Sequence, residues 1–121
     1  MKESILKNKS FAFAIRVVNL YKYLCDEKKE FVLSKQVLRS GTSVGAMIRE
    51  AEHAESKSDF IHKLAIAQKE INETIYWLEL LNETGYFTPE MFTTLNHDAV
   101  EIIKLLTSSI KTAKQSQTPA P

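Results

Sequence analysis

The sequence predicts an all-α protein: an antiparallel four-helix bundle with up-down-up-down order. Three observations support this fold class. Apolar residues recur at helical spacing in four long segments, short polar stretches separate these segments, and only three glycines and three prolines interrupt the 121 residues. Short connections make successive helices run antiparallel. We therefore expect a four-helix bundle domain over residues 1–114 and a flexible C-terminal tail over residues 115–121.

The first helix is expected over residues 9–26, where two neighbouring apolar rows occur at helical spacing. The row that we expect to face the core consists of Phe11, Ile15, Val18, Tyr21 and Cys25. The second row consists of Phe13, Val17, Leu20 and Leu24. The charged residues 26–30 then predict a loop.

The second helix is expected over residues 34–55, with Ser34 as its N-cap. Its core face consists of Val37, Gly41, Val44, Ile48 and Ala51. Two glycines in a helix interior cost about 1 kcal/mol each relative to alanine, so they need a compensating reason. Close approach of a neighbouring helix is that reason, because no phosphate-binding loop ending in Lys-Ser/Thr is present.

The third and fourth helices have the clearest boundaries. Ser56 and Asp59 have the spacing of a capping box, Gly85 supplies a left-handed C-terminal residue, and Thr88 followed by Pro89 opens the last helix. The expected core row of the third helix consists of Phe60, Leu64, Ala67, Ile71, Thr74, Leu78 and Leu81. That of the fourth consists of Phe92, Leu95, Ala99, Ile102, Leu106 and Ile110.

Helices one and four carry more apolar residues than one core-facing stripe requires. Exposed apolar surface of this kind marks interfaces, so we expect self-association; a wide core stripe is the alternative. The candidate interface residues are Phe13, Val17, Leu20 and Leu24 of the first helix, and Val100 and Ile103 of the fourth.

Positive and negative residues are segregated along the chain, although the net charge is only +1. Residues 1–39 hold nine Lys/Arg and four Asp/Glu, whereas residues 40–106 hold five and eleven. A basic flank of the second helix is a candidate phosphate-binding surface, and a merely solubilising helix face is the alternative. The candidate nucleic-acid-binding residues are Arg16, Lys22, Lys35, Arg39 and Arg49.

Enzymatic or metal chemistry has little support in the sequence. Cys25 lies in an apolar row, which favours an inert thiol, and no nucleophile has a matching base. Glu50 and His53 have the spacing of a metal-ligating pair, with His62 nearby, but both histidines fall near one connection rather than mid-bundle. We therefore expect no enzyme, no cofactor and no bound metal, and a metal-binding bundle is only a weak alternative.

The cellular location follows from simple features. The chain has one cysteine, no run of 18 apolar residues, and no apolar core of a secretory signal in its first residues. We expect a cytoplasmic protein without membrane association.

A distinctive run of residues extends over 34–81. It consists of Gln36, RSGTSVGA at 39–46, REA at 49–51, AES at 54–56, Asp59, Phe60, Lys63, Leu64, Ala67, Lys69, Glu70, Glu73, Thr74, Trp77 and Leu78. This run, about 50 of 121 residues, resembles the bacterial four-helix bundle proteins also called 23S rRNA intervening-sequence proteins.

The resemblance implies a four-helix bundle that assembles as a ring-like homopentamer. Relatives of the family include the accessory variability proteins of diversity-generating retroelements, which look like basic pentamers that bind nucleic acid and a reverse transcriptase. This chain differs from them in being nearly neutral. We expect a homo-oligomeric accessory or scaffold that associates with RNA or another nucleic acid, and with a protein such as a reverse transcriptase. A pure protein-interaction scaffold is the alternative.

Overall fold

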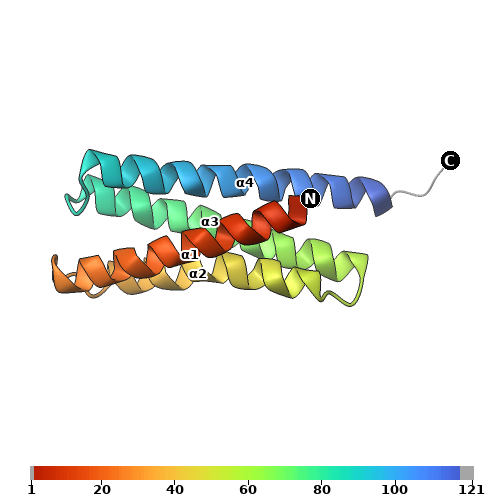
Figure 1. The fold of residues 1–121 in the computed structure, drawn as a ribbon, viewed down its shortest axis with the longest axis horizontal. Coiled ribbons are helices and arrows are strands. Elements are labelled where there is room, and N and C mark those ends of the chain that lie inside the picture. The colour runs from red at the N-terminus through yellow and green to blue at the C-terminus, as the bar shows by residue number, and fades with distance from the viewer. Residues whose placement is uncertain (1, 118–121) are drawn as a thin grey trace.

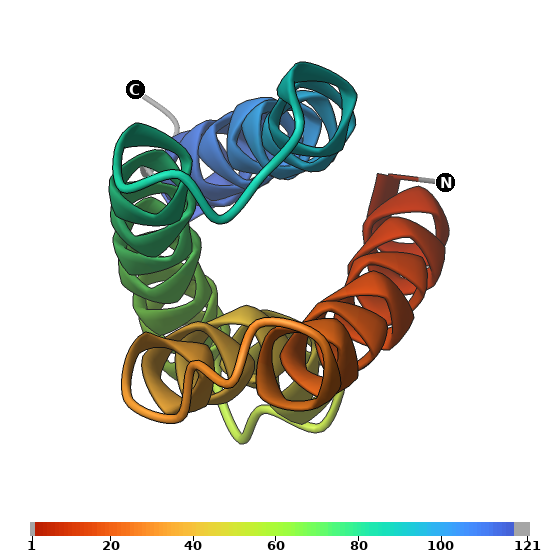
Figure 2. The same ribbon diagram turned by 90° about the vertical axis from the view of Figure 1, so that its left-hand side faces the viewer.

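The protein, described over residues 2–117 by a computed structural model, consists of four helices and confirms the all-α prediction. The helices are α1 (Lys2–Asp26), α2 (Leu33–Glu52), α3 (Lys57–Glu83) and α4 (Pro89–Gln117). Figure 1 shows the α1–α2 and α3–α4 connections at one end of the bundle and the α2–α3 connection at the other. Successive helices therefore run antiparallel. Each helix contacts the next, and α1 contacts α4 (Figure 2).

Two helices extend beyond their predicted ends. α1 begins at Lys2 rather than near residue 9, and its first turns bury Leu6 in the core. α4 continues to Gln117, so residues 115–117 of the predicted tail are helical and residues 118–121 lie outside the described part. In contrast, α2 ends at Glu52, with His53 as its C-cap, a few residues before the predicted end.

The start of α2 differs from the prediction that Ser34 is its N-cap. Val32 occupies the N-cap position and makes no side-chain cap. The carboxylate of Glu30 instead accepts the backbone N–H groups of Val32, Leu33 and Ser34 at 3.2, 3.0 and 2.7 Å. A carboxylate that accepts several orphaned N–H groups also complements the positive end of the helix dipole. Ser34 is thereby left as a buried residue inside the first turn.

The N-caps predicted for α3 and α4 are confirmed. The Ser56 hydroxyl accepts the backbone N–H of Asp59 at 3.0 Å, and the Thr88 hydroxyl accepts that of Met91 at 3.2 Å. Each bond satisfies one N–H group that has no partner within the helix.

The predicted C-terminal signal of α3 is also confirmed. Gly85 has a φ of 87°, the left-handed conformation that glycine adopts without steric cost. The N–H of Tyr86 donates to the carbonyl of Leu81 at 3.0 Å, and that of Gly85 donates to Asn82 at 3.3 Å. These two bonds form a Schellman ending.

The apolar row of α1 that faces the core is the one that was predicted to lie at an interface on the outside of the bundle. Val17 packs against Gly41 so closely that a Cβ on Gly41 would lie 2.8 Å from its γ carbons. At Gly45 a Cβ would lie 3.4 Å from the carbonyl oxygen of Ser10. The glycines thus permit the close approach of α1 and α2, as predicted, and this contact turns one particular row of α1 inward. The buried apolar residues of this row are Leu6, Phe13, Val17, Leu20 and Leu24.

The remaining helices bury the rows that were predicted, apart from half-buried residues at their starts. The buried residues form two clusters. Phe60 is half-buried and packs against one of them, and Phe92 is half-buried and packs against the other. Over residues 2–117, none of the helices is long and apolar enough to cross a membrane.

Candidate functional site

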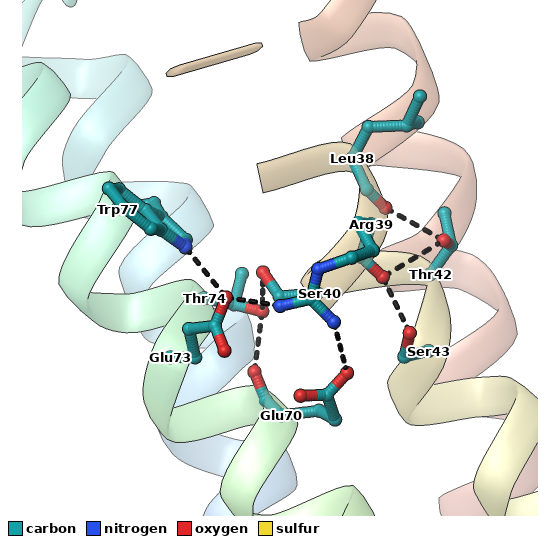
Figure 3. A network of polar contacts seen from close by, with 9 residues as sticks. All are labelled: Leu38, Arg39, Ser40, Thr42, Ser43, Glu70, Glu73, Thr74 and Trp77. Carbon is teal, nitrogen blue, oxygen red and sulfur yellow. Dashed lines mark hydrogen bonds and ion pairs between the residues drawn. The ribbon is translucent and has the colours of Figure 1, made fainter. Parts of the chain in front are cut away.

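A polar network joins α2 to α3 along the outer side of their contact (Figure 3). The guanidinium of Arg39 donates to Glu70 at 2.9 Å and forms a second ion pair with Glu73. Glu73 also accepts the indole N–H of Trp77 at 3.0 Å. One arginine thus holds two carboxylates of α3, and an aromatic residue one turn further fixes the second carboxylate.

Beneath these charges lies a buried pair of hydroxyl groups. Those of Ser40 and Thr74 are hydrogen-bonded at 2.9 Å, and Thr74 Oγ1 also donates to the carbonyl of Glu70 at 2.8 Å. Both residues are fully buried, so their mutual bond removes the cost of burying unpaired polar groups. The network therefore satisfies polar groups that the α2–α3 contact encloses.

The network shifts the ionisation of its charged members. The indole N–H of Trp77, and after it Arg39, hold the pKa of Glu73 below its ordinary value. The hydrogen bond to Glu73 in turn raises the pKa of Arg39. At neutral pH both groups are charged and satisfy one another, so Arg39 is a structural cation of the α2–α3 contact, although about half of its side chain is exposed.

Arg16, a second residue that was predicted to contact phosphate, is also held by an ion pair within the chain. Its guanidinium donates to the Asp98 carboxylate at 2.6 Å and to the hydroxyl and carbonyl of Thr94 at 2.9 and 3.2 Å. Arg16 thus ties α1 to α4. This pairing could not be predicted from the sequence, because the partners are about 80 residues apart in the chain.

The other three predicted phosphate contacts are exposed, and no ion pair involves them among residues 5–116, whose side chains the structure describes. The Arg49 guanidinium lies over the ring of Phe11, 4.9 Å from its centroid, which is a cation–π contact. Lys22 and Lys35 lie nearer the other end of the α1–α2 pair. The five predicted residues therefore do not form one continuous basic stripe.

The predicted interface residues of α1 are not available to a partner. Phe13, Val17, Leu20 and Leu24 are all buried within the single chain, which corrects the earlier assignment. Periodicity identified two apolar rows but could not decide which of them docks on the glycines of α2. In α4, Val100 is half-buried, and Ile103 is half-buried against the core.

The exposed apolar row of α1 is the one that was expected to face the core. Phe11 is 52% exposed and Ile15 is 49% exposed, and Val18 lies half-buried one turn further along the same side. We call these three residues, with Arg49 beside them, the α1 outer face. It is an apolar surface with a cation at its margin.

The candidate metal ligands are not gathered into a site. The Glu50 carboxylate forms an ion pair with Lys63 at 3.1 Å, while His53 and His62 are exposed. Within the described part of the chain, no group of three or more His, Cys, Asp or Glu residues could hold a metal ion. Cys25 is half-buried, and its sulfur lies 3.8 Å from the Ser34 hydroxyl.

Four exposed lysines on α3 and α4 were not among the predicted phosphate contacts. They are Lys69, Lys104, Lys111 and Lys114. Counting charge over residues 40–106 as one block hid Lys69 and Lys104 among acidic residues elsewhere, and Lys111 and Lys114 lie beyond that block. A count in shorter windows would have found them, because residues 102–121 contain no Asp or Glu.

Comparisons with known proteins agree with this architecture. The family model described as 23S rRNA-intervening sequence protein matches residues 2–108. The chain is similar to a crystal structure of a protein with unknown function from the S23 ribosomal protein family of Bacteroides thetaiotaomicron. The two share 62% sequence identity and a TM-score of 0.91, over 92% of this chain and 99% of that one. None of the curated proteins matches the chain.

Proposed function

Because the chain belongs to the family of 23S rRNA-intervening sequence proteins, we propose that it is a non-enzymatic, self-assembling helical scaffold. The observation that carries this proposal is the α1 outer face. α1 buries one apolar row inside its own bundle and presents a second row, with Phe11 and Ile15 about half exposed, to the outside. Contiguous exposed apolar surface on a globular protein marks an interaction site.

The composition of the α1 outer face favours a protein partner. Its centre is apolar and includes an aromatic residue, and Arg49 at its margin is already held over Phe11. An apolar centre with aromatic and arginine residues and a polar rim is the usual composition of a protein–protein interface. We take a second copy of the chain as that partner, and the resemblance to the family implies five copies.

The test compares two surface variants by light scattering. Phe11→Glu combined with Ile15→Glu places two charges on the α1 outer face, and we expect the molar mass to fall to the 13.8 kDa of one chain. The control is Val32→Glu, because Val32 is 70% exposed in the α1–α2 connection and lies away from this face. A double variant that keeps the mass of the parent protein would show that assembly uses another surface.

Association with nucleic acid is a second candidate function. The observation that favours it is a set of exposed lysines and one arginine without carboxylate partners among residues 5–116, in contrast to Arg16 and Arg39. Binding to phosphates by such cations weakens steeply with salt. Absence of any gel shift with RNA at low salt would refute this candidate and leave a pure protein scaffold.

A further inference from the structure

The second half of α4 presents an unusually one-sided charge to the outside. Lys104, Lys111 and Lys114 are exposed, and residues 102–121 contain no acidic residue. Lys104 and Lys111 are seven residues apart, which is about two helical turns or 10.5 Å along one side of the helix. Lys114 lies about 4.5 Å further along the helix axis.

The neighbouring part of α3 continues this surface. Residues 60–69 also contain no Asp or Glu, and Lys69 is exposed. The Gln68 side-chain amide donates to the hydroxyl of Thr107 at 2.9 Å and so ties α3 to α4. Gln68, Thr107, Lys111 and Lys114 line one shallow hollow between the two helices. Two acid-free segments thus meet side by side.

The lysines of this surface have no ion-pair partner among residues 5–116, in contrast to five other cations of the bundle. Lys7, Lys9, Lys63, Arg16 and Arg39 are each held by a carboxylate. Among the side chains that the structure describes, no such pair involves Lys69, Lys104, Lys111 or Lys114. A charge that is not neutralised internally is available to an external anion, and several such charges on one surface raise the local positive potential.

We propose that this surface binds the sugar–phosphate backbone of nucleic acid. We call it the α4 track, and it consists of Lys69, Lys104, Lys111 and Lys114 with Gln68 and Thr107. The inference rests on the second candidate function above and names the site at which that function would act. Lysines neutralise phosphates, and amide and hydroxyl groups of Gln and Thr donate to phosphate oxygens.

The composition of the α4 track also defines how it binds. It contains no arginine fork for a guanine edge and no aromatic ring on which a base could stack. Binding is therefore independent of base sequence and depends on charge. Four phosphate contacts give a slope of log K against log salt of about −2.8 for a single strand, from about 0.7 for each contact.

The experiment measures fluorescence anisotropy of a labelled 30-nucleotide oligouridylate with the full-length protein over a series of salt concentrations. One variant replaces Lys104, Lys111 and Lys114 by Gln. The matched control replaces Lys7, Lys9 and Lys63 by Gln, which removes the same charge from lysines that are each held by a carboxylate. Circular dichroism and molar mass confirm that both variants keep the fold and the assembly of the parent protein.

We expect the α4 variant to lower the magnitude of the salt slope by about 2, from about 0.7 for each of three lost contacts, while the control keeps the parent slope. Equal losses in both variants would show that only total charge matters, and loss in the control alone would move the site to the ion-paired lysines. Either result overturns the α4 track but leaves nucleic-acid binding intact. No binding by the parent protein at low salt would overturn the second candidate function itself. Binding of an acidic peptide to the α4 track, without RNA binding, would assign it to a protein partner.

Discussion

Replacing each of the two glycines of α2 by alanine should affect the free energy of unfolding differently at the two positions. Both positions lie inside a helix, where alanine is favoured over glycine by about 1 kcal/mol. At Gly45 the new methyl group would lie 3.4 Å from the Ser10 carbonyl oxygen, close to ordinary contact. We therefore expect Gly45→Ala to raise the free energy of unfolding by up to about 1 kcal/mol.

At Gly41 the same substitution would place a methyl group against a buried core residue. The new Cβ would lie 2.8 Å from both γ carbons of Val17, and Val17 is a fully buried, β-branched residue with little rotamer freedom. Overpacking of this kind costs about 1–3 kcal/mol, which offsets or exceeds the gain in helix propensity. Gly41→Ala should thus be neutral or destabilising by up to about 2 kcal/mol.

Urea unfolding followed by circular dichroism measures both variants, at one fixed protein concentration because assembly contributes to apparent stability. The predicted difference between the two alanine variants is about 1–3 kcal/mol, with Gly45→Ala the more stable. If Gly41→Ala stabilised the protein as much as Gly45→Ala, the close contact of Val17 with α2 would be wrong. In that case the assignment of the core-facing row of α1 would fail with it.

Three further predictions concern single side chains. Lys29 has a φ of 56°, so Lys29→Gly should raise the free energy of unfolding by about 1 kcal/mol, measured by urea titration against Lys28→Gly. The hydroxyl of Ser109 is buried with no hydrogen-bond partner in the described residues, so Ser109→Ala should stabilise by about 1 kcal/mol, and a loss of stability would reveal an unrecognised partner. The pKa of Glu73 is lowered in the folded protein, so its contribution is present at neutral pH and is lost as the pH falls through the folded pKa, below the ordinary 4.5. The parent protein should therefore be more stable than Glu73→Gln at pH 7, and thermal unfolding should show this difference shrinking below pH 4.5; a constant difference would contradict the lowered pKa.

The number of helices and most of their boundaries follow from local signals. Thr88 and Ser56 cap the following helices through their own hydroxyl groups, and Gly85 ends α3 through its own backbone freedom. Signals of this kind depend on a few neighbouring residues, so they can be read without knowledge of the tertiary structure. The cap of α2 was missed because Glu30 acts from the preceding loop, outside the usual N-cap position.

The orientation of α1 could not be predicted from α1 alone. Its two apolar rows have similar hydrophobicity, and the choice between them is made by the fit of Val17 to Gly41 on another helix. The same limit applies to charge. Arg39 and Arg16 were predicted to be free because their carboxylate partners lie about 30 and 80 residues away in the sequence. Tertiary packing decides which cations remain available to an external anion.

We propose that a second copy of the chain covers the α1 outer face. Sedimentation equilibrium of the parent protein at several concentrations measures this directly. We expect a multiple of the 13.8 kDa chain mass, with five copies expected from the family resemblance. A mass of 13.8 kDa at every concentration would contradict it and would leave Phe11 and Ile15 exposed on a monomer.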